Sequence, residues 1–380
     1  MIQKVLLRDI LEISKTSVNP AKHPNTSFDV YSIPGYDAGH PEKQLGSEIK
    51  STKFVVTAGS ILVSKLNPRI PRVWKVAKAS ENAISSTEFV VLKLKKGYEE
   101  LFEYIYAALS SNHFATFLQS HVKGTSGSHQ RVKPEDIYDY RVTIDPPNSV
   151  KVGDFIRNID EKIELNRQMN ETLEQMGQAL FRHYFIDNPE AGKWEEESLD
   201  KIADFLNGLA MQKYPKIDGE PTLPVIKIRE MSSGITANTD IASANIPEQY
   251  VVRNGDLLFS WSGTLLVKFW AEGDGALNQH LFKVSSENYP EWLYYYWTKH
   301  HLDYFIQTAK SKATTMGHIQ RKHLAQARVR VPDTELLEKI GNQIQPLIDM
   351  YKEKAQQIQT LTTLRDTLLP RLINGKVKIP

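Results

Sequence analysis

Apolar residues at steps of three and four mark two long segments of the chain. Residues 152–186 contain no proline, so this spacing predicts one continuous helix. Its apolar positions are Ile156, Ile159, Ile163, Leu173, Leu180 and Tyr184. A second segment near the C-terminus repeats the stepping at Ile344, Leu347, Tyr351, Leu361, Leu368 and Leu372. The matching stripes predict that the two helices pack against each other as a coiled coil.

Polar residues interrupt the first stripe. Asn166, Asn170 and Gly177 fall on seam positions, and Lys354, Ile358 and Arg365 occupy the corresponding places in the second helix. Polar seam residues weaken a coiled coil but fix its register and orientation. We therefore expect Asn166, Asn170 and Ile358 to belong to the helix–helix seam. The helix pair is expected to act as a spacer of set length, which an insertion of about one turn in both helices would lengthen.

The regions that precede the two helices share one order of elements. After an amphipathic start and a polar loop, residues 1–150 predict strands at 54–56, 61–66, 73–76, 88–94 and 140–144, with a helical stretch at 98–121. Short motifs return in the same order in residues 199–333. GSILVS (59–64) returns as GDLLFS (255–260), AISSTEFVV (83–91) as ALNQHLFKV (276–284), and RVTI (141–144) as RVRV (328–331). The chain therefore contains an internal repeat.

The repeat predicts an α+β protein. Two similar mixed, mostly β domains are expected at residues 1–150 and 188–333, separated by two long antiparallel helices at 151–187 and 334–380. A duplicated unit of this kind forms a pseudo-two-fold arrangement. The two domains are then expected at opposite ends of the helix pair.

Composition and charge narrow the functional classes. The chain has 380 residues, 41% of them hydrophobic, a net charge of +2 and no cysteine. Disulfides and thiolate metal sites are therefore excluded. No apolar run is long enough to span a membrane and the N-terminus lacks the layout of a signal peptide, so a cytoplasmic location is expected. The mild charge permits nucleic-acid binding without indicating it.

Catalytic motifs are missing from the sequence. It contains neither a GxxxxGK[ST] phosphate loop nor a GxGxxG turn. Asp145-Pro-Pro-Asn148 resembles an adenine methyltransferase motif but has Asn where an aromatic residue stacks the base. His300, His301 and Asp303 point in different directions on a helix, which disfavours a metal site. We therefore predict no catalytic residue, no metal site and no cofactor bound by this chain.

Hydrogen-bonding side chains crowd one loop at the same place in each repeat. Arg and Gln can bond base edges, whereas Lys, Ser and Thr suit phosphates, so these loops are predicted to bind DNA. The first loop offers Lys123, Thr125, Ser126, Ser128, His129, Gln130, Arg131 and Lys133. The second offers Lys310, Lys312, Thr314, Thr315, His318, Gln320, Arg321 and Lys322. Further candidates near a second loop are Lys65, Arg69, Arg72, Trp261, Ser262 and Lys268.

The repeat and several motifs of the second half resemble a known family. RNGDLLFSWSGTLLVKFW with GALNQHLFKV, DKIADFLNGLAMQKYP and RVRVPDTELLEKIGNQIQPL are similar to the specificity subunit of type I restriction-modification systems. The resemblance covers essentially the whole chain. It departs from the family at Glu335, which lacks the Gln that commonly follows, and in residues 145–154, which lack the Glu-Gln pair. These departures affect where the helices begin.

The resemblance implies a non-catalytic DNA-binding subunit. Each target recognition domain would bind one half of a split, asymmetric site in double-stranded DNA, and the helices would set the gap. Modification subunits that use S-adenosylmethionine and restriction subunits that use ATP and magnesium would be its partners. The alternative is a coiled-coil interaction scaffold with two β-rich binding domains. Its docking surface would be the apolar, Tyr-rich helices 102–117 and 292–305, which could equally contact modification subunits.

Overall fold

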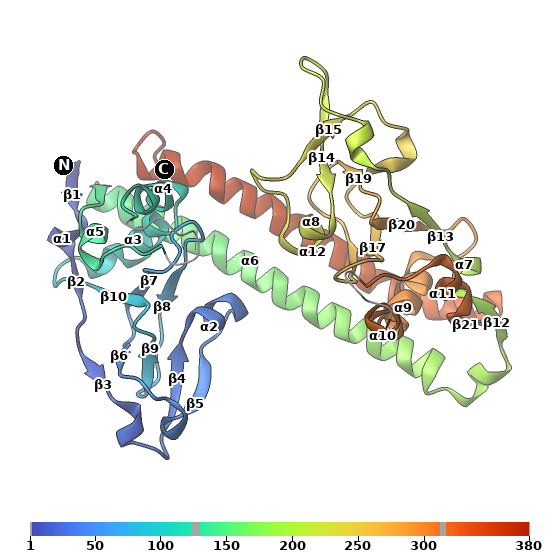
Figure 1. The fold of residues 1–380 in the computed structure, drawn as a ribbon, viewed down its shortest axis with the longest axis horizontal. Helices are drawn as coiled ribbons and strands as arrows, with labels where there is room; N and C mark the ends of the chain where they lie inside the picture. Colours follow the sequence, from blue (N-terminus) through green and yellow to red (C-terminus); the bar gives the residue numbers. More distant parts are fainter. Residues whose placement is uncertain (1, 123–129, 312–316, 380) are drawn as a thin grey trace. The chain divides into compact units, whose positions relative to one another are not determined.

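A computed structural model describes residues 2–122, 130–311 and 317–379. The chain divides into two compact units (Figure 1). Unit 1 comprises Met1–Glu161 and Thr362–Pro380, and unit 2 comprises Lys162–Leu361. Each unit contains one of the repeated domains together with part of both long helices.

The central sheet of unit 1 is covered on both faces. Its strands lie in the order β2-β10-β7-β8, with bounds Leu11–Ile13, Phe89–Leu94, Ser60–Ser64 and Val73–Val76. Alternate side chains of a strand point to opposite faces. Ile61 and Val63 therefore join the core beneath helices α3 (Phe102–Leu109) and α4 (Asn112–Ser120), whereas Leu62 joins a separate cluster with Phe89.

A five-stranded sheet replaces part of the predicted N-terminal loop. Its order is β3-β6-β9-β4-β5, with bounds Ser17–Val18, Lys53–Val55, Ala83–Ser85, Ser27–Tyr31 and Glu42–Leu45. The loop prediction was wrong at β4 and β5. Phe28 and Val30 are buried and alternate with polar residues, which is the pattern of a strand. Nearby Pro, Gly and Asn residues obscured this short alternation.

Unit 2 repeats these elements. The sheet β13-β20-β17-β18 has bounds Asp204–Asn207, Leu281–Ser285, Leu257–Ser260 and Val267–Phe269. The sheet β15-β14-β19-β16 has bounds Ile241–Ser243, Thr222–Ile226, Gly275–Leu277 and Val251–Val252. Strand β14 runs parallel to β19, as β4 does to β9. The predicted repeat and the predicted α+β class are confirmed.

A pair of strands closes each domain beside the start of a long helix. In unit 1, β1 (Gln3–Leu6) pairs with β11 (Arg141–Ile144), and in unit 2, β12 (Glu195–Ser198) pairs with β21 (Arg328–Val331). Short helices α1 (Leu7–Ile10) and α7 (Leu199–Ile202) follow β1 and β12. Helices α2 (Ile33–Ala38) and α8 (Ile228–Ser233) follow β4 and β14.

The Tyr-rich helices of unit 2 are core elements. Helix α9 (Glu291–His300) buries Trp292, Tyr295 and Tyr296, and α10 (Leu302–Ser311) buries Phe305, all in one cluster with Phe259. Because these aromatic side chains are buried, they are not available to a partner. These four side chains therefore do not form the predicted docking surface, since a sequence pattern does not distinguish a face covered within the chain from one covered by a partner. For helix 102–117 the docking surface stays a prediction.

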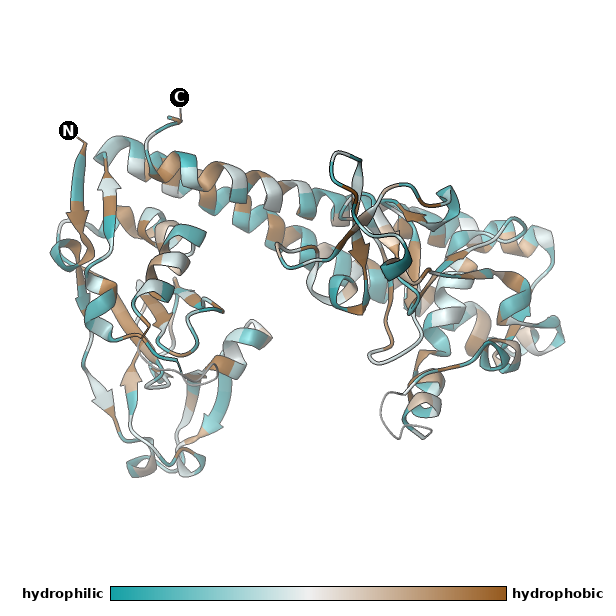
Figure 2. Ribbon diagram, turned by 45° about the horizontal axis from the view of Figure 1, so that its top comes forward, coloured by the Kyte–Doolittle hydropathy of each residue, from teal (hydrophilic) through white to brown (hydrophobic). Residues whose placement is uncertain are grey.

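The long helices are α6 (Pro146–Phe181), which continues in a π-helical turn (Arg182–Ile186), and α12 (Thr334–Ile373). Helix α6 therefore begins before the predicted residue 151. Pro146 and Pro147, expected to end a strand, open the helix, because N–H groups of a first helical turn have no intrahelical acceptor and proline has none to lose. Figure 2 shows bands of hydrophobic residues recurring along both helices between hydrophilic ones.

The two helices run antiparallel within unit 2. Gln343 donates from its side-chain amide to the Tyr184 hydroxyl at 3.0 Å, and Asn166 donates to Gln357 at 3.2 Å, so ascending positions on α6 meet descending positions on α12. In unit 1, Arg365 of α12 pairs with Asp160 of α6 at 2.8 Å.

Burial follows most of the predicted seam. The buried predicted positions are Ile156, Ile159, Ile163, Asn166, Leu173, Ile344 and Leu372. The half-buried ones are Asn170, Leu180, Tyr184, Leu347, Tyr351, Ile358, Leu361 and Leu368. At two places the buried residue is the one after the predicted seam position. Ile348 is buried in place of Leu347 and Leu369 in place of Leu368, because Ile348 and Leu369 pack into the domain cores. In the part of the chain that the structure describes, no helix is long and apolar enough to cross a membrane.

Candidate nucleic-acid interface

Two loops that the sequence singled out meet in unit 2. Trp261 and Ser262 follow strand β17, and His318 precedes helix α11 (Arg321–Gln326). Ser262 and His318 form a β-bridge, and the Ile319 amide donates to the Trp261 carbonyl at 2.9 Å. These backbone contacts bring the predicted loop residues together.

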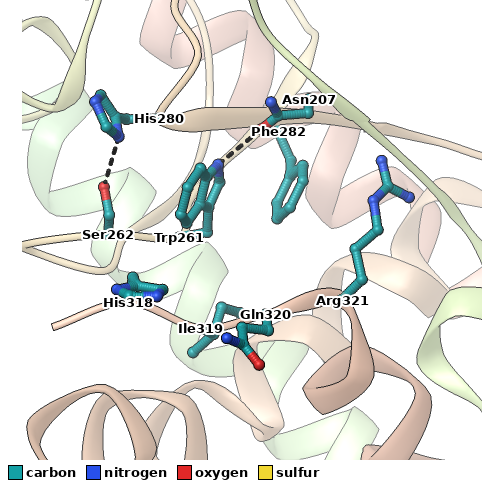
Figure 3. Close-up of a pocket in the computed structure, with 9 residues that line it drawn as sticks. All are labelled: Asn207, Trp261, Ser262, His280, Phe282, His318, Ile319, Gln320 and Arg321. Atoms are coloured by element: carbon teal, nitrogen blue, oxygen red, sulfur yellow. Dashed lines mark hydrogen bonds between the residues drawn. The ribbon is translucent and has the colours of Figure 1, made fainter. Parts of the chain in front are cut away.

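The junction forms an open cleft of about 680 Å³ (Figure 3). Trp261 and Phe282 form an aromatic wall, with ring centres 5.9 Å apart and an interplanar angle of 33°. Ile319 and Gln320 lie across the cleft from them, and Arg321 stands at one end. The complete lining is Asn207, Trp261, Ser262, His280, Phe282, His318, Ile319, Gln320 and Arg321.

The aromatic wall is held in place by hydrogen bonds. The Trp261 indole N–H donates to Asn207 at 2.9 Å, and Asn207 ends strand β13. The hydroxyl of the buried Ser262 lies 3.2 Å from Nδ1 of His280. Because Asn207 belongs to a strand of the central sheet, it holds the Trp261 ring in place without a bound ligand.

Arg321 and Gln320 border the cleft from the first turn of α11. Arg321 donates to the Phe205 carbonyl at 3.1 Å, and its guanidinium carbon lies 5.9 Å from the Phe282 ring centre. The Gln320 side chain is exposed at the N-terminus of the helix. Arginine and glutamine are the side chains that bond base edges most readily, so this end of the cleft can hydrogen-bond a polar ring.

Unit 1 joins the same two loops by the same backbone contacts. Leu66 bridges Arg131, and the Val132 amide donates to the Lys65 carbonyl at 3.1 Å. Asn67 donates to the Gln130 carbonyl at 2.9 Å, as Gly263 does to Gly317 at 2.9 Å. Lys65 therefore takes the place of Trp261, and Arg131 that of His318.

The backbone contacts also correct the sequence alignment of the two repeats. The Lys65 amide donates to the Glu88 carbonyl at 2.8 Å, and the Trp261 amide to the His280 carbonyl at 3.3 Å. Glu88 therefore corresponds to His280, whereas the sequence match placed it opposite Leu281. That match was one residue out of register because similar apolar residues follow both positions.

Arg131 is held by Glu88 in unit 1. Its guanidinium donates to Glu88 at 2.9 Å, while 60% of the Arg131 side chain stays exposed. The second carboxylate oxygen of Glu88 and the side-chain oxygen of Asn67 are buried without a partner among the residues that the structure describes. An ion pair in unit 1 thus stands where unit 2 has His280 and His318.

Arg72 and Lys268, two further candidates, are engaged within the fold. Arg72 makes a bidentate ion pair with Asp37 at 2.8 and 3.0 Å, and only 12% of its side chain is exposed. Hydrogen bonding to Arg72 lowers the pKa of Asp37. Lys268 donates to the Met231 carbonyl at 3.1 Å. The two cations tie helices α2 and α8 to the central sheets, and their contacts with DNA remain predictions.

The other predicted site residues are placed as follows. Lys65 and Gln130 are half-buried, whereas Arg69, Lys133, Lys310 and Lys322 are exposed. Lys123, Thr125, Ser126, Ser128, His129, Lys312, Thr314 and Thr315 lie outside the described residues.

The sequence did not single out several residues of the junctions. Asn207 and Phe282 line the cleft from strands β13 and β20, and His280 lines it from the turn before β20. Glu88 corresponds to His280 in unit 1. His280 carried one available signal, because it is a polar residue beside an apolar strand motif. The others become neighbours of the loops only through the order of the strands in the sheet.

His300 and His301 lie at the C-terminal end of helix α9, where His300 is exposed and His301 is half-buried. Burial lowers the pKa of both His300 and His301, and Nε2 of His301 donates to the Arg328 carbonyl at 2.8 Å. Across the described ranges, the structure contains no cluster of three or more His, Asp or Glu side chains suited to a metal ion.

Two repeated α+β domains, each with a loop junction at the same place, define a duplicated recognition protein with two long helices. The sequence profile described as "Type I restriction modification DNA specificity domain" matches residues 2–175 and 191–363. The chain belongs to this family and carries two copies of its domain.

Similar proteins support the assignment. The specificity subunit of the type I restriction enzyme HindI from Haemophilus influenzae is 20% identical, over 86% of this chain and 88% of the relative. The MjaIX specificity subunit from Methanocaldococcus jannaschii is 22% identical, over 62% of this chain and 60% of the relative.

A solved structure shares the fold. The S subunit of a type I restriction-modification system from M. genitalium has a TM-score of 0.62 at 15% identity, covering 98% of this chain and 96% of that chain. The predicted assignment to type I specificity subunits is confirmed, and the interaction scaffold is not favoured.

Proposed function

We propose that unit 1 and unit 2 each bind one half of a split, asymmetric site in double-stranded DNA. The observation that carries the proposal is the loop junction. Identical backbone contacts build it in both units, but its side chains are Lys65, Glu88 and Arg131 in one and Trp261, His280 and His318 in the other. One scaffold with two different sets of recognition side chains suits two different half-sites.

The exposed cations around the junctions suit the DNA backbone. Arg69 and Lys133 lie near the junction of unit 1, and Lys322 follows Arg321 in unit 2. Lysine contacts to phosphates contribute salt-dependent affinity, whereas sequence is distinguished by bonds to base edges in the major groove. We assign base contacts to Arg131, Gln320 and Arg321.

The chain is proposed to act without catalysing a reaction itself. It would direct modification subunits, which methylate adenine with S-adenosylmethionine, and restriction subunits, which use ATP and magnesium, to the bound site in the cytoplasm. The chemistry is therefore assigned to the partners.

Co-expression of the chain with type I modification subunits tests the proposal. Genomic adenine methylation is mapped with and without this chain. Methylation of one split sequence only when the chain is present is the expected result. Methylation that is independent of the chain, or that falls on a sequence without a gap, would contradict it.

A further inference from the structure

The candidate site of unit 2 is a concave cleft, whereas a protein surface that inserts into the major groove is convex. Base edges of an intact duplex lie inside the base stack and present only their rims to the major groove. Such rims meet side chains that project from a protein surface. A cleft of about 680 Å³ walled by Trp261 and Phe282 instead admits a planar group that projects from the DNA.

The lining has the composition of a site for a nucleobase. Proteins that hold an extrahelical base stack it against aromatic or apolar side chains and hydrogen-bond its Watson–Crick edge. The partly exposed Trp261 ring supplies the aromatic face, backed by the buried Phe282, and Ile319 adds an apolar edge beside it (Figure 3). Gln320 and Arg321 stand where the polar edge of a ring would lie.

The aromatic wall is formed before any ligand binds. Asn207 accepts a hydrogen bond from the Trp261 indole at 2.9 Å, and the His280 ring lies beside the indole with ring centres 5.7 Å apart. A preformed stacking surface reduces the entropy lost when a base is captured, which offsets part of the cost of unstacking.

Unit 1 provides an internal contrast. Lys65 stands in place of Trp261, and the ion pair between Arg131 and Glu88 stands in place of the two histidines. A charged pair at 2.9 Å offers no stacking surface, whereas its exposed guanidinium suits a base edge. The two units therefore differ in the kind of contact they can make.

We propose that unit 2 takes one nucleobase of its half-site out of the duplex stack and holds it against Trp261, while unit 1 binds its half-site with the bases stacked. This inference rests on the proposed function, because it concerns the same junctions. It adds the ligand class, a single extrahelical nucleobase, and the residue that binds it.

Fluorescent base analogues test the inference in the assembled complex. Each position of both half-sites is replaced in turn by 2-aminopurine or pyrrolocytosine, which brighten when unstacked. Positions of the methylated adenines are left out, because a methyltransferase extrudes its own target. A severalfold rise in fluorescence is expected for the analogue at one position of the half-site bound by unit 2. No rise is expected at any position of the other half-site.

Variants connect the signal to the cleft. Trp261→Ala is expected to abolish the rise and to weaken binding roughly 5- to 150-fold, the loss that follows removal of one base–aromatic stacking contact. Trp261→Phe keeps an aromatic face and is expected to keep the rise. Lys193→Ala, at an exposed residue outside both junctions, is the control and should leave the fluorescence rise unchanged.

The possible outcomes separate the inference from the proposed function. Sequence-specific binding by the wild-type complex without a rise at any position overturns the inference alone. A rise that survives in a folded Trp261→Ala complex also overturns it. If Trp261→Ala fails to fold, Gln320→Ala is tested instead, because the Gln320 side chain is exposed. Loss of the fluorescence rise in this variant supports the inference, and an unchanged rise overturns it. Absence of sequence-specific binding by the wild-type complex overturns the proposed function instead.

Discussion

Asn166 occupies a seam position of α6 where an aliphatic side chain would pack. It is fully buried, donates to Gln357 at 3.2 Å, and leaves its side-chain oxygen without a partner among the described residues. Leaving a buried acceptor unsatisfied costs free energy, so this residue weakens the helix pair. It also favours the one register in which Gln357 lies opposite.

Asn166→Leu is therefore expected to raise the free energy of unfolding by about 1–3 kcal/mol, the cost of one unsatisfied buried polar group. Urea unfolding of the full chain measures the change. Asn166→Asp is the matched control, because it keeps the shape but brings a charge into the seam, and it is expected to lower the stability. A Leu variant that is less stable than the natural chain would show that the amide contributes more than it costs.

At the residue scale, the sequence predicted part of the candidate site. Trp261, Ser262, His318, Gln320 and Arg321 were recognised because they cluster within two short loops. Asn207, His280 and Phe282 were missed because they come from strands far along the chain, and only the sheet order makes them neighbours. The ion pair between Arg72 and Asp37 was not predicted, since Asp37 lies on a helix that the sequence did not reveal.

At the element scale, helix α9 is attached to both long helices within unit 2. Glu174 of α6 accepts hydrogen bonds from Tyr295 and Lys299, each at 2.6 Å, and Lys352 of α12 pairs with Glu291 at 2.6 Å. Glycine allows the close approach at Gly177, where an added Cβ would overlap the Tyr296 hydroxyl. Gly177, a flaw in the predicted apolar stripe, thus serves the attachment of the recognition domain to the helix.

Gly177→Ala is expected to lower the free energy of unfolding by about 1–3 kcal/mol, because the buried Tyr296 ring must move to admit the methyl group. Thermal unfolding monitored by circular dichroism measures this loss. Gly192→Ala is the matched control, because a Cβ at Gly192 meets nothing within 4 Å. Equal stability of the two variants would refute the close contact.

Element boundaries were predicted less well than element types. Pro146 and Pro147 are compatible with either the end of a strand or the first turn of a helix, and the sequence alone did not distinguish these two structures. Strands β4 and β5 were missed because each is short and flanked by turn residues. The long helices were predicted because their apolar spacing extends over many turns.

At the scale of the whole molecule, the duplication was the strongest signal in the sequence. Individual motifs such as RVTI and RVRV match by chance, but several in the same order do not, and the two matches to the family profile confirm the repeat. What duplication leaves unspecified is how the two copies differ. That difference lies in a few side chains, with Lys65, Glu88 and Arg131 in one junction and Trp261, His280 and His318 in the other.

The central claim is that each unit recognises one half of the DNA site. It is tested most directly by binding the assembled complex to duplexes altered at one base pair at a time. Arg131→Ala should reduce discrimination by about 1–3 kcal/mol at a position of one half-site only, and Arg321→Ala at a position of the other only. Lys322→Ala, a phosphate-type control, should weaken binding to every duplex alike. Equal loss of discrimination in both half-sites for either arginine variant would contradict the account.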